Sequence, residues 1–230
     1  MGKNAATVSE SVPFCMLLAI VGGFLDAYTF VGRGGVFCNA QTGNIVLFGI
    51  YISTGRWQLA LNHIPPILAF IVGVFFAETI KKGKSPTRYL DWKGIILIFE
   101  GVVLFVVGLI PSSAPNVIVT ATVSLVSSIQ IASFRKLVDS PFNTTMSTGN
   151  LFLASQALYL AITQKDIDAA IRSTRYFIII FSFLSGALLG GIITSLFGIK
   201  AIWGTIVPLI CAVVLINIEK GSKRKCCPHI

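Results

Sequence analysis

The sequence is poor in charged residues: Asp, Glu, Lys and Arg together make up only 12% of its 230 residues. A soluble domain of ordinary composition carries about 25%. Hydrophobic residues make up 54%, and the mean hydropathy is +0.83. So little polar surface cannot cover the apolar side chains in water, which excludes an ordinary soluble domain. The composition indicates an all-α integral membrane protein with a single membrane domain, residues 1–230.

Motifs for catalysis, metal binding and nucleotide binding are also lacking. The five cysteines do not have metal-ligand spacing, and His63 and His229 are far apart in the sequence. Neither a phosphate loop nor a nucleophile elbow occurs. We therefore expect no enzyme, no metal and no cofactor. The net charge of +9 comes from short segments that flank apolar runs, as in membrane proteins, so we also expect no nucleic-acid partner.

Apolar runs occur eight times along the chain. A full transmembrane helix needs about 20 residues, with a range of about 17–25. Six runs reach or nearly reach this length, whereas the second and sixth are shorter, and short runs are more often re-entrant or interfacial. Residues 164–175 are predicted to form a short polar helix at the membrane surface. The eight runs are Pro13–Val31, Thr42–Ser53, Ile64–Ile80, Gly94–Ile110, Val117–Phe134, Thr148–Ile162, Tyr176–Phe197 and Ile199–Ile218.

The two short runs begin with the same tripeptide, Thr-Gly-Asn, at 42–44 and 148–150. The run after each of them contains Phe-x-x-Gly-x-x-x followed by a small residue, starting at Phe70 and at Phe183. This second pattern allows close contact between helices in membranes. Two matched elements in the same order predict an internal duplication. We place the first repeat at 11–111, the second at 115–218, and a basic cytoplasmic tail at 219–230.

The distribution of Lys and Arg distinguishes two topologies. If all eight runs cross the membrane, the 18 basic residues divide evenly between its two sides. If the two short runs enter and leave on one side, all basic residues except Arg33, Arg56 and Lys200 lie on the side of the termini. The positive-inside rule therefore favours six transmembrane helices plus two re-entrant half-helices in inverted repeats, with N- and C-termini cytoplasmic. The alternative is eight transmembrane helices in two parallel four-helix repeats.

Two re-entrant helices would place a polar site in the middle of the membrane. Each helix starts with backbone N–H groups that lipid cannot satisfy, and facing ends would suit an anion or a polar solute. The alternative is that the polar residues there only cap helices and satisfy one another. The predicted solute-binding residues are Asp26, Asn39, Gln41, Thr42, Gly43, Asn44, Gln130, Asn143, Thr144, Thr148, Gly149 and Asn150.

Two acidic residues, Asp26 and Glu100, lie inside apolar runs. An ionisable group at membrane depth costs about 2.5–3.5 kcal/mol on insertion scales, so such residues usually have a function. We interpret both as candidates for proton coupling. The alternative for Asp26 is an ion pair with Arg33 or a hydrogen bond to a neighbouring helix.

Two stretches resemble the YoaK-like family of bacterial membrane proteins. One contains Gly22-Gly-Phe-Leu-Asp26-Ala-Tyr-Thr-Phe and Gly34-Gly-Val-Phe-Cys-Asn39-Ala-Gln-Thr-Gly-Asn44. The other contains Ser133-Phe-Arg-Lys and Asn143-Thr-Thr-Met-Ser-Thr-Gly-Asn150. The resemblance covers nearly the whole chain, and the two Thr-Gly-Asn blocks are its specific parts. The family is a domain of unknown function, DUF1275, so the resemblance implies a location in the bacterial inner membrane and no substrate or mechanism.

The function that these patterns favour is a multi-pass membrane transporter or channel for a small polar or anionic solute, with proton coupling as an option. The alternative is a non-transporting membrane scaffold or assembly factor that binds partner helices through its small-residue faces. A polar path between the two Thr-Gly-Asn ends would favour transport, and a dry, packed centre would favour the scaffold. The expected partners are membrane lipid and the solute, and a homo-oligomer is left open.

Overall fold

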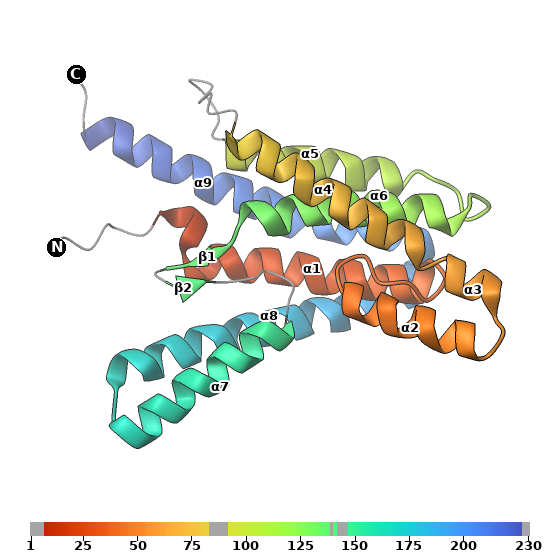
Figure 1. Cartoon of the computed structure of the whole chain (residues 1–230). Coiled ribbons are helices and arrows are strands. Elements are labelled where there is room, and N and C mark those ends of the chain that lie inside the picture. The colour runs from red at the N-terminus through yellow and green to blue at the C-terminus, as the bar shows by residue number, and fades with distance from the viewer. Residues whose placement is uncertain (1–6, 83–91, 139, 142–146, 227–230) are drawn as a thin grey trace.

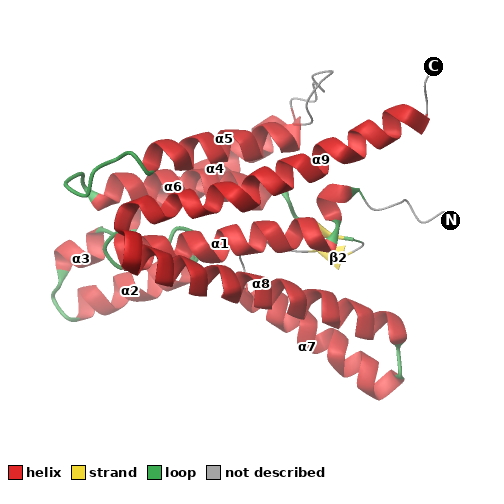
Figure 2. Ribbon diagram, turned by 180° about the vertical axis from the view of Figure 1, so that it is seen from behind, coloured by secondary structure: helices red, strands yellow, loops and turns green. Residues whose placement is uncertain are grey.

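The computed structural model describes residues 7–82, 92–138, 140–141 and 147–226, which form a bundle of helices (Figures 1 and 2). Two short strands, β1 (Lys136–Leu137) and β2 (Ser140–Pro141), pair antiparallel at one end of it. The helices are α1 (Val12–Gly32), α2 (Gln41–Ser53), α3 (Trp57–Leu61), α4 (Ile64–Lys82), α5 (Trp92–Val107), α6 (Asn116–Ser133), α7 (Ser147–Gln164), α8 (Ile167–Phe197) and α9 (Ile206–Cys226), with 3-10 helices η1 (Val8–Glu10) and η2 (Gly198–Thr205).

Each of the eight predicted apolar runs contains a helix, but two predictions at the ends of helices are wrong. The polar segment 164–175 is not a separate surface helix, because α8 begins at Ile167 and continues without interruption to Phe197. The Asp166 side chain caps this start by accepting a hydrogen bond from the backbone N–H of Ala169 at 3.0 Å. The last run does not form a helix from Ile199, because η2 intervenes and α9 begins only at Ile206.

Six long helices, α1, α4, α5, α6, α8 and α9, lie lengthwise in the bundle (Figures 1 and 2). We call the end that holds both chain termini the near end, at the left of Figure 1, and the opposite end, with α3, the far end. Successive long helices run in opposite directions between these ends, starting with α1, which runs from the near end to the far end.

The two helices that carry Thr-Gly-Asn follow different paths. After α1 the chain turns at Gly34 and Gly35, which have φ of 89° and 75°, and comes back along α1. The Asn39 side-chain Nδ2 donates a hydrogen bond to the Gly22 carbonyl, in the middle of α1, at 3.1 Å. Helix α2 therefore begins beside the middle of α1 and returns to the far end, whereas α7 begins about midway along the length of the bundle, packs against α8, and ends at the near end (Figure 1).

Close helix contacts depend on glycine at several positions, of which Gly23, Gly73 and Gly186 are the tightest against backbone. Helix α1 packs mainly against α8, and α4 packs mainly against α6. A side chain at Gly186 would collide with the backbone carbonyl of Ile20 on α1, and one at Gly73 with that of Leu125 on α6. Gly23 faces the backbone of α8 in the same way. These contacts confirm that the Phe-x-x-Gly pattern marks close approach between helices.

Gly186→Ala is expected to lower the free energy of unfolding by about 1–3 kcal/mol, because its methyl group meets backbone atoms that cannot move aside. Gly191→Ala on the same helix is the matched control, since the space beside Gly191 is open. There we expect a gain of up to about 1 kcal/mol, because glycine is a poor helix former. Thermal unfolding of the purified protein in detergent measures both variants. Equal stabilities would contradict the close packing of α1 against α8.

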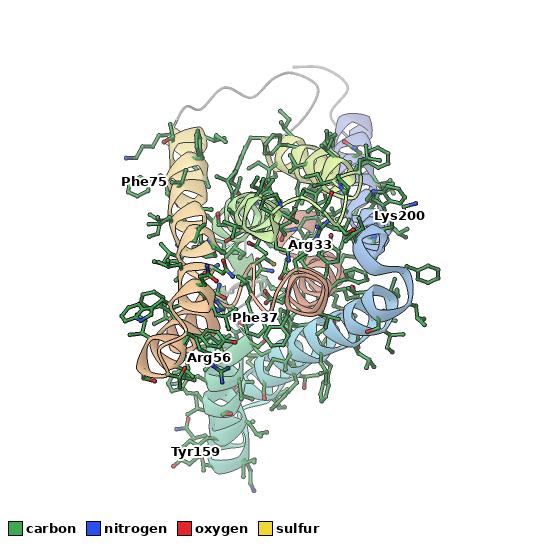
Figure 3. All side chains as sticks on the ribbon, turned by 90° about the vertical axis from the view of Figure 1, so that its right-hand side faces the viewer. Arg33, Phe37, Arg56, Phe75, Tyr159 and Lys200 are labelled. Atoms are coloured by element: carbon green, nitrogen blue, oxygen red, sulfur yellow. The ribbon has the colours of Figure 1, made fainter. Side chains whose placement is uncertain are left out.

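The outside of the bundle is apolar and its inside contains polar side chains. Phe75 is 71% exposed and points away from the bundle (Figure 3), whereas Asn44 is fully buried. Within the described residues, four helical stretches are long and apolar enough to cross a membrane. This arrangement is that of an all-α membrane protein. The four stretches are Val12–Gly32, Trp57–Lys82, Asn116–Ser133 and Ile167–Ile218.

Candidate functional site

The Asp26 carboxylate is the centre of a hydrogen-bond network between α1 and the loop before α2. Its Oδ1 accepts hydrogen bonds from the backbone N–H groups of Asn39, at 2.8 Å, and Ala40, at 3.4 Å. The Cys38 thiol also donates to this oxygen, at 3.4 Å. Oδ2 is buried and has no hydrogen-bond partner within the described part of the chain. Asp26 thus fixes the loop with one oxygen and leaves the other unused in the interior.

The predicted alternative of an ion pair between Asp26 and Arg33 is wrong. Arg33 Nε instead donates a hydrogen bond to the Tyr28 hydroxyl at 3.1 Å. The ion pairs in the described ranges, Glu78 with Lys81 and Asp166 with Arg172, lie at the near end. Asp26 therefore depends on hydrogen bonds, not on a countercharge, for its place in the interior.

Gln41 and Asn44, at the start of α2, are satisfied by their neighbours. Gln41 Nε2 donates to the Cys38 carbonyl at 2.7 Å and to the Ser124 hydroxyl of α6 at 3.1 Å. Asn44 Nδ2 donates to the Phe37 carbonyl at 2.7 Å and to Gln41 Oε1 at 2.9 Å, and its Oδ1 accepts from the Phe37 N–H at 3.0 Å. These two amides fix the loop and α2 against α6. This agrees with the alternative interpretation, in which the polar residues satisfy one another.

His63 joins the same network, although its place in the sequence suggested no role. Its Nδ1 lies 3.1 Å from Asn44 Oδ1, and its ring stacks on that of Tyr51 with centroids 5.6 Å apart. His63 is 2% exposed, at the start of α4. The histidine therefore connects the two ends of the α2–α3 segment.

The two Thr-Gly-Asn motifs have the same pattern of burial. Their asparagines, Asn44 and Asn150, are buried, whereas their threonines, Thr42 and Thr148, are exposed. The predicted lining role of the threonines thus finds no support in their position. Gly43 lies against the Phe37 ring, which would be 2.9 Å from an added Cβ, and Gly149 is exposed with open space beside it. The predicted residues Asn143 and Thr144 lie outside the described residues.

A buried polar stripe follows one side of α6. It consists of Thr120, Ser124, Ser127 and Gln130, each no more than 1% exposed. Their spacing of four, three and three residues places them on neighbouring turns of one helix side. Ser127 Oγ and Gln130 Nε2 have no hydrogen-bond partner among the described residues. An unsatisfied buried polar group costs about 1–3 kcal/mol, so these atoms are expected to have a use other than packing.

Only Gln130 of this stripe was among the predicted site residues. The period of three to four residues between Thr120, Ser124 and Ser127 is visible in the sequence and would have identified the stripe. Ser124 Oγ also donates to the Pro66 carbonyl of α4 at 2.8 Å, so α6 is linked to both α2 and α4 at this level.

Glu100 stands apart from the network around Asp26. It is 1% exposed, and neither of its carboxylate oxygens has a hydrogen-bond partner within the described ranges. It lies on α5, which packs mainly against α6 and α9. The two acidic residues that were predicted for proton coupling thus lie on different helices, Asp26 on α1 and Glu100 on α5.

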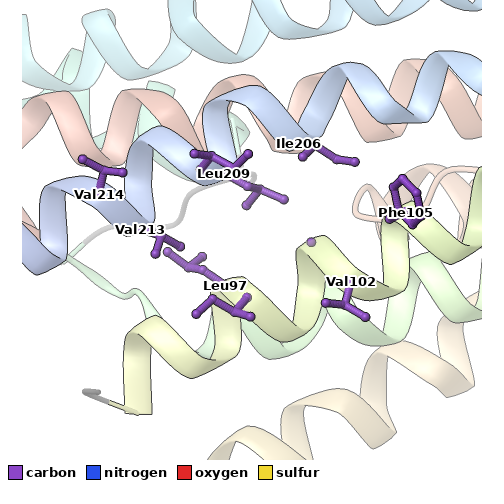
Figure 4. A pocket seen from close by; sticks show the side chains of 10 residues that line it. Leu97, Val102, Phe105, Ile206, Leu209, Val213 and Val214 are labelled. Atoms are coloured by element: carbon purple, nitrogen blue, oxygen red, sulfur yellow. The ribbon is translucent and has the colours of Figure 1, made fainter. Parts of the chain in front are cut away.

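Two cavities differ in chemistry. The far-end pocket, of about 260 Å³, is lined by Arg33, Gly34, Asn62, Asn116 and Thr120 among others. A groove of about 360 Å³ between α5 and α9 is lined by apolar side chains such as Leu97, Phe105 and Leu209 (Figure 4). No group of His, Cys, Asp and Glu side chains in the described ranges has the number and proximity to hold a metal ion. The polar features therefore converge on α1, α2, α6 and the far-end pocket.

Comparison with known proteins connects the chain to one family and one curated relative. The family described as "Protein of unknown function (DUF1275)" matches residues 14–215. The "UPF0700 transmembrane protein YoaK" of Bacillus subtilis (strain 168) is 29% identical over 141 residues, which are 59% of this chain and 61% of the relative. The chain thus matches less than two thirds of the length of that relative. No solved structure matches the chain.

Proposed function

This chain belongs to the DUF1275 family of proteins of unknown function, and we propose that it is a multi-pass membrane transporter or channel for a small polar or anionic solute. The observation that carries the proposal is the set of buried polar atoms on α1 and α6 that have no partner in the described part of the chain, around the level where α2 begins. Such atoms are costly in a membrane unless they serve a solute or an ion. We propose that the protein lets a solute cross the membrane and catalyses no reaction.

The proposed topology has six membrane-spanning helices, α1, α4, α5, α6, α8 and α9, and two re-entrant helices, α2 and α7. Four of the six, α1, α4, α6 and α8, lie within the four stretches that are long and apolar enough to span, and the last stretch also contains α9 as far as Ile218. Helix α7 is 18 residues long but is not among these stretches, because polar residues interrupt it. Both α2 and α7 start about midway along the length of the bundle and end at opposite ends of it, which supports a re-entrant path for both (Figure 1).

The packing of the helices supports an inverted duplication of 11–111 and 115–218. Exchange of α1 with α6, α4 with α8 and α5 with α9 converts the α4–α6 contact into the α8–α1 contact. The same exchange converts the α5–α6 contact into the α9–α1 contact. Gly73 and Gly186, which the sequence pattern matched, occupy equivalent places in these contacts. Two halves related by duplication are expected to show the same contacts after each helix is exchanged with its counterpart.

The orientation that we propose places the near end in the cytoplasm and the chain in the inner membrane. The near end holds both termini and the basic residues around the ends of α4, α6 and α7. Among the described residues, the basic residues at the far end are Arg33, Arg56 and Lys200. This asymmetry agrees with the positive-inside rule. The N- and C-termini are then both cytoplasmic.

The solute path that we propose follows α6. Thr120 lines the far-end pocket, and Ser124, Ser127 and Gln130 continue from it toward the near end. Ser124 of α6 lies next to the start of α2, because it accepts a hydrogen bond from Gln41. Asp26 and Glu100 are the proposed sites of proton coupling, since both are buried and have carboxylate oxygens without a partner among the described residues.

The second candidate function is a non-transporting scaffold or assembly factor. The observation in its favour is that Gln41 and Asn44 are hydrogen-bonded to their neighbours, as in a site that only fixes a loop. The apolar groove between α5 and α9 would then receive a partner helix, including one of a second copy.

Uptake into vesicles decides between the two functions. The purified full chain is reconstituted, and uptake of acetate, phosphate, urea and glycerol is compared with that of protein-free vesicles, with and without a pH gradient. We expect uptake of at least one of these solutes at a rate about tenfold above protein-free vesicles or more. Uptake equal to that of protein-free vesicles for all four solutes, together with stable co-purification of a partner, would favour the scaffold.

A further inference from the structure

We infer that the far-end pocket binds a small oxyanion, and this identifies the solute of the proposed function as an anion. That the anion is transported rests on the proposed function. That the pocket binds an anion rests only on the geometry of the pocket. The pocket has a volume of about 260 Å³, and Arg33 is the only charged residue among the described residues that line it.

Arg33 is a buried cation without a countercharge. Its side chain is 1% exposed and forms no ion pair with any acidic residue in the described ranges. In the view onto the far end, Arg33 lies among the helices, whereas Lys200 lies at the periphery (Figure 3). A guanidinium group stays charged in proteins, and a buried charge without a partner is strongly unfavourable. An anion in the pocket would supply the missing charge.

Neighbouring groups fix the guanidinium and leave one of its nitrogens without a hydrogen-bond partner among the described residues. Nε donates to the Tyr28 hydroxyl at 3.1 Å, and this hydroxyl donates in turn to the Ile199 carbonyl at 3.1 Å. Nη2 donates to the Ile110 carbonyl at 3.4 Å, and the guanidinium lies 5.9 Å from the centre of the Tyr28 ring. Nη1 is buried and has no hydrogen-bond partner in the part of the chain that is described. A positioned donor of this kind suits the oxygen of a carboxylate or phosphate.

The other walls of the pocket also favour negative charge. Helix α6 begins there at Asn116, so the positive end of its dipole and its first N–H groups border the pocket. The side-chain amide of Asn116 lies over Gly34, with its Nδ2 3.4 Å from where a Cβ would be. Asn62, from the segment between α3 and α4, also lines the pocket. None of these groups brings a negative charge.

The whole far end lacks acidic residues. The segments that connect helices there, 33–63, 108–115 and 198–205, contain Arg33, Arg56 and Lys200 but neither Asp nor Glu. A surface of one sign attracts ions of the other sign and raises their local concentration. The pocket therefore lies where an anion from the far side would first meet the polar stripe of α6, which Thr120 begins.

Binding is tested on the purified full chain in an uncharged detergent, with potassium phosphate and potassium acetate as probes. We expect the melting temperature to rise by about 3 °C at saturating anion, since a ligand that binds only the folded state stabilises it. Arg33→Gln should lose this rise, and Arg56→Gln, which removes an exposed arginine at the same end, should keep it. General salt effects on stability act on all variants alike, so the rise in melting temperature of Arg33→Gln is compared with that of Arg56→Gln.

Asn116→Asp provides a second test in case Arg33→Gln fails to fold. The new carboxylate faces the pocket and replaces the anion, so we expect a higher melting temperature without added anion and no further rise with it. An equal rise in wild type, Arg33→Gln and Asn116→Asp would overturn the inference. Stabilisation by short-chain phosphatidylglycerol but by neither free anion would also overturn it, because the pocket would then hold a lipid headgroup.

The outcome is separable from that of the proposed function. A rise in melting temperature that depends on Arg33, combined with no uptake in vesicles, would support the anion site and contradict transport. Uptake of urea or glycerol without any rise that depends on Arg33 would contradict the anion site and support transport.

Discussion

Asp26→Leu is expected to lower the free energy of unfolding by about 3 kcal/mol or more, because it removes the acceptor that holds the loop before α2. Asp26 Oδ1 accepts hydrogen bonds from the backbone of Asn39 and Ala40 and from the Cys38 thiol. Leucine has a similar size but no acceptor, so these buried donors would lose their partner. Thermal unfolding in detergent measures the loss, and a variant as stable as the wild type would contradict the role of Asp26 in fixing the loop.

Asp26→Asn separates the charge of this residue from its hydrogen bonds. The amide retains one acceptor oxygen for the Asn39 N–H, so we expect a loss of only about 1 kcal/mol. If the carboxylate takes part in transport, uptake into vesicles should fall about tenfold or more and should no longer respond to a pH gradient. Uptake equal to that of wild type would leave Asp26 as a structural residue and would remove it from the proposed path.

Gln130→Leu is expected to stabilise the protein and to impair transport. Gln130 is 1% exposed, and its Nε2 has no hydrogen-bond partner within the described residues. Replacement of an unsatisfied amide by an apolar side chain of similar length should raise the free energy of unfolding by about 1 kcal/mol. The same change interrupts the polar stripe of α6, so uptake should fall about tenfold or more. A gain in stability with a loss of function is typical of residues kept for their activity.

Ser133→Ala is the matched control on the same helix. Ser133 is also buried, but its hydroxyl donates to the Ile129 carbonyl of its own helix at 2.6 Å. Its removal should leave uptake unchanged. A loss of stability in Gln130→Leu would indicate that the amide is engaged in packing, and unchanged uptake in this variant would exclude the stripe as the solute path.

The helices and the membrane class could be predicted from the sequence because both depend on local composition. Apolar runs between charged segments determined where α1, α2 and α4 lie, and the glycines at positions 73 and 186 indicated close helix contact. The prediction of a separate surface helix over 164–175 was wrong because neither Gly nor Pro stands between Ile167 and Tyr176 to end a helix there, so α8 is continuous. The polar composition of that stretch indicated a separate helix on the membrane surface, but the chain stays helical from there into the apolar run.

The site was harder to predict because its chemistry depends on contacts between distant segments. Asn44 was expected to face a solute, but Phe37, Gln41 and His63 satisfy its amide. Arg33 follows α1 directly and looks like an ordinary flanking cation of a membrane helix. Only the fold shows that it is buried and that Tyr28 and Ile110 hold it in the far-end pocket.

The most direct test of the account is the side of the membrane on which positions 56 and 165 lie. Arg56 follows α2 and Lys165 follows α7, and both are exposed. The two helix ends lie at opposite ends of the bundle (Figure 1). Arg56→Cys and Lys165→Cys, in a background with the five natural cysteines replaced, are treated with a membrane-impermeant maleimide in intact cells and in inside-out vesicles. We expect labelling of position 56 in intact cells only and of position 165 in inside-out vesicles only. Labelling of both positions from the same side would mean that α2 and α7 cross the membrane, and it would contradict the re-entrant arrangement.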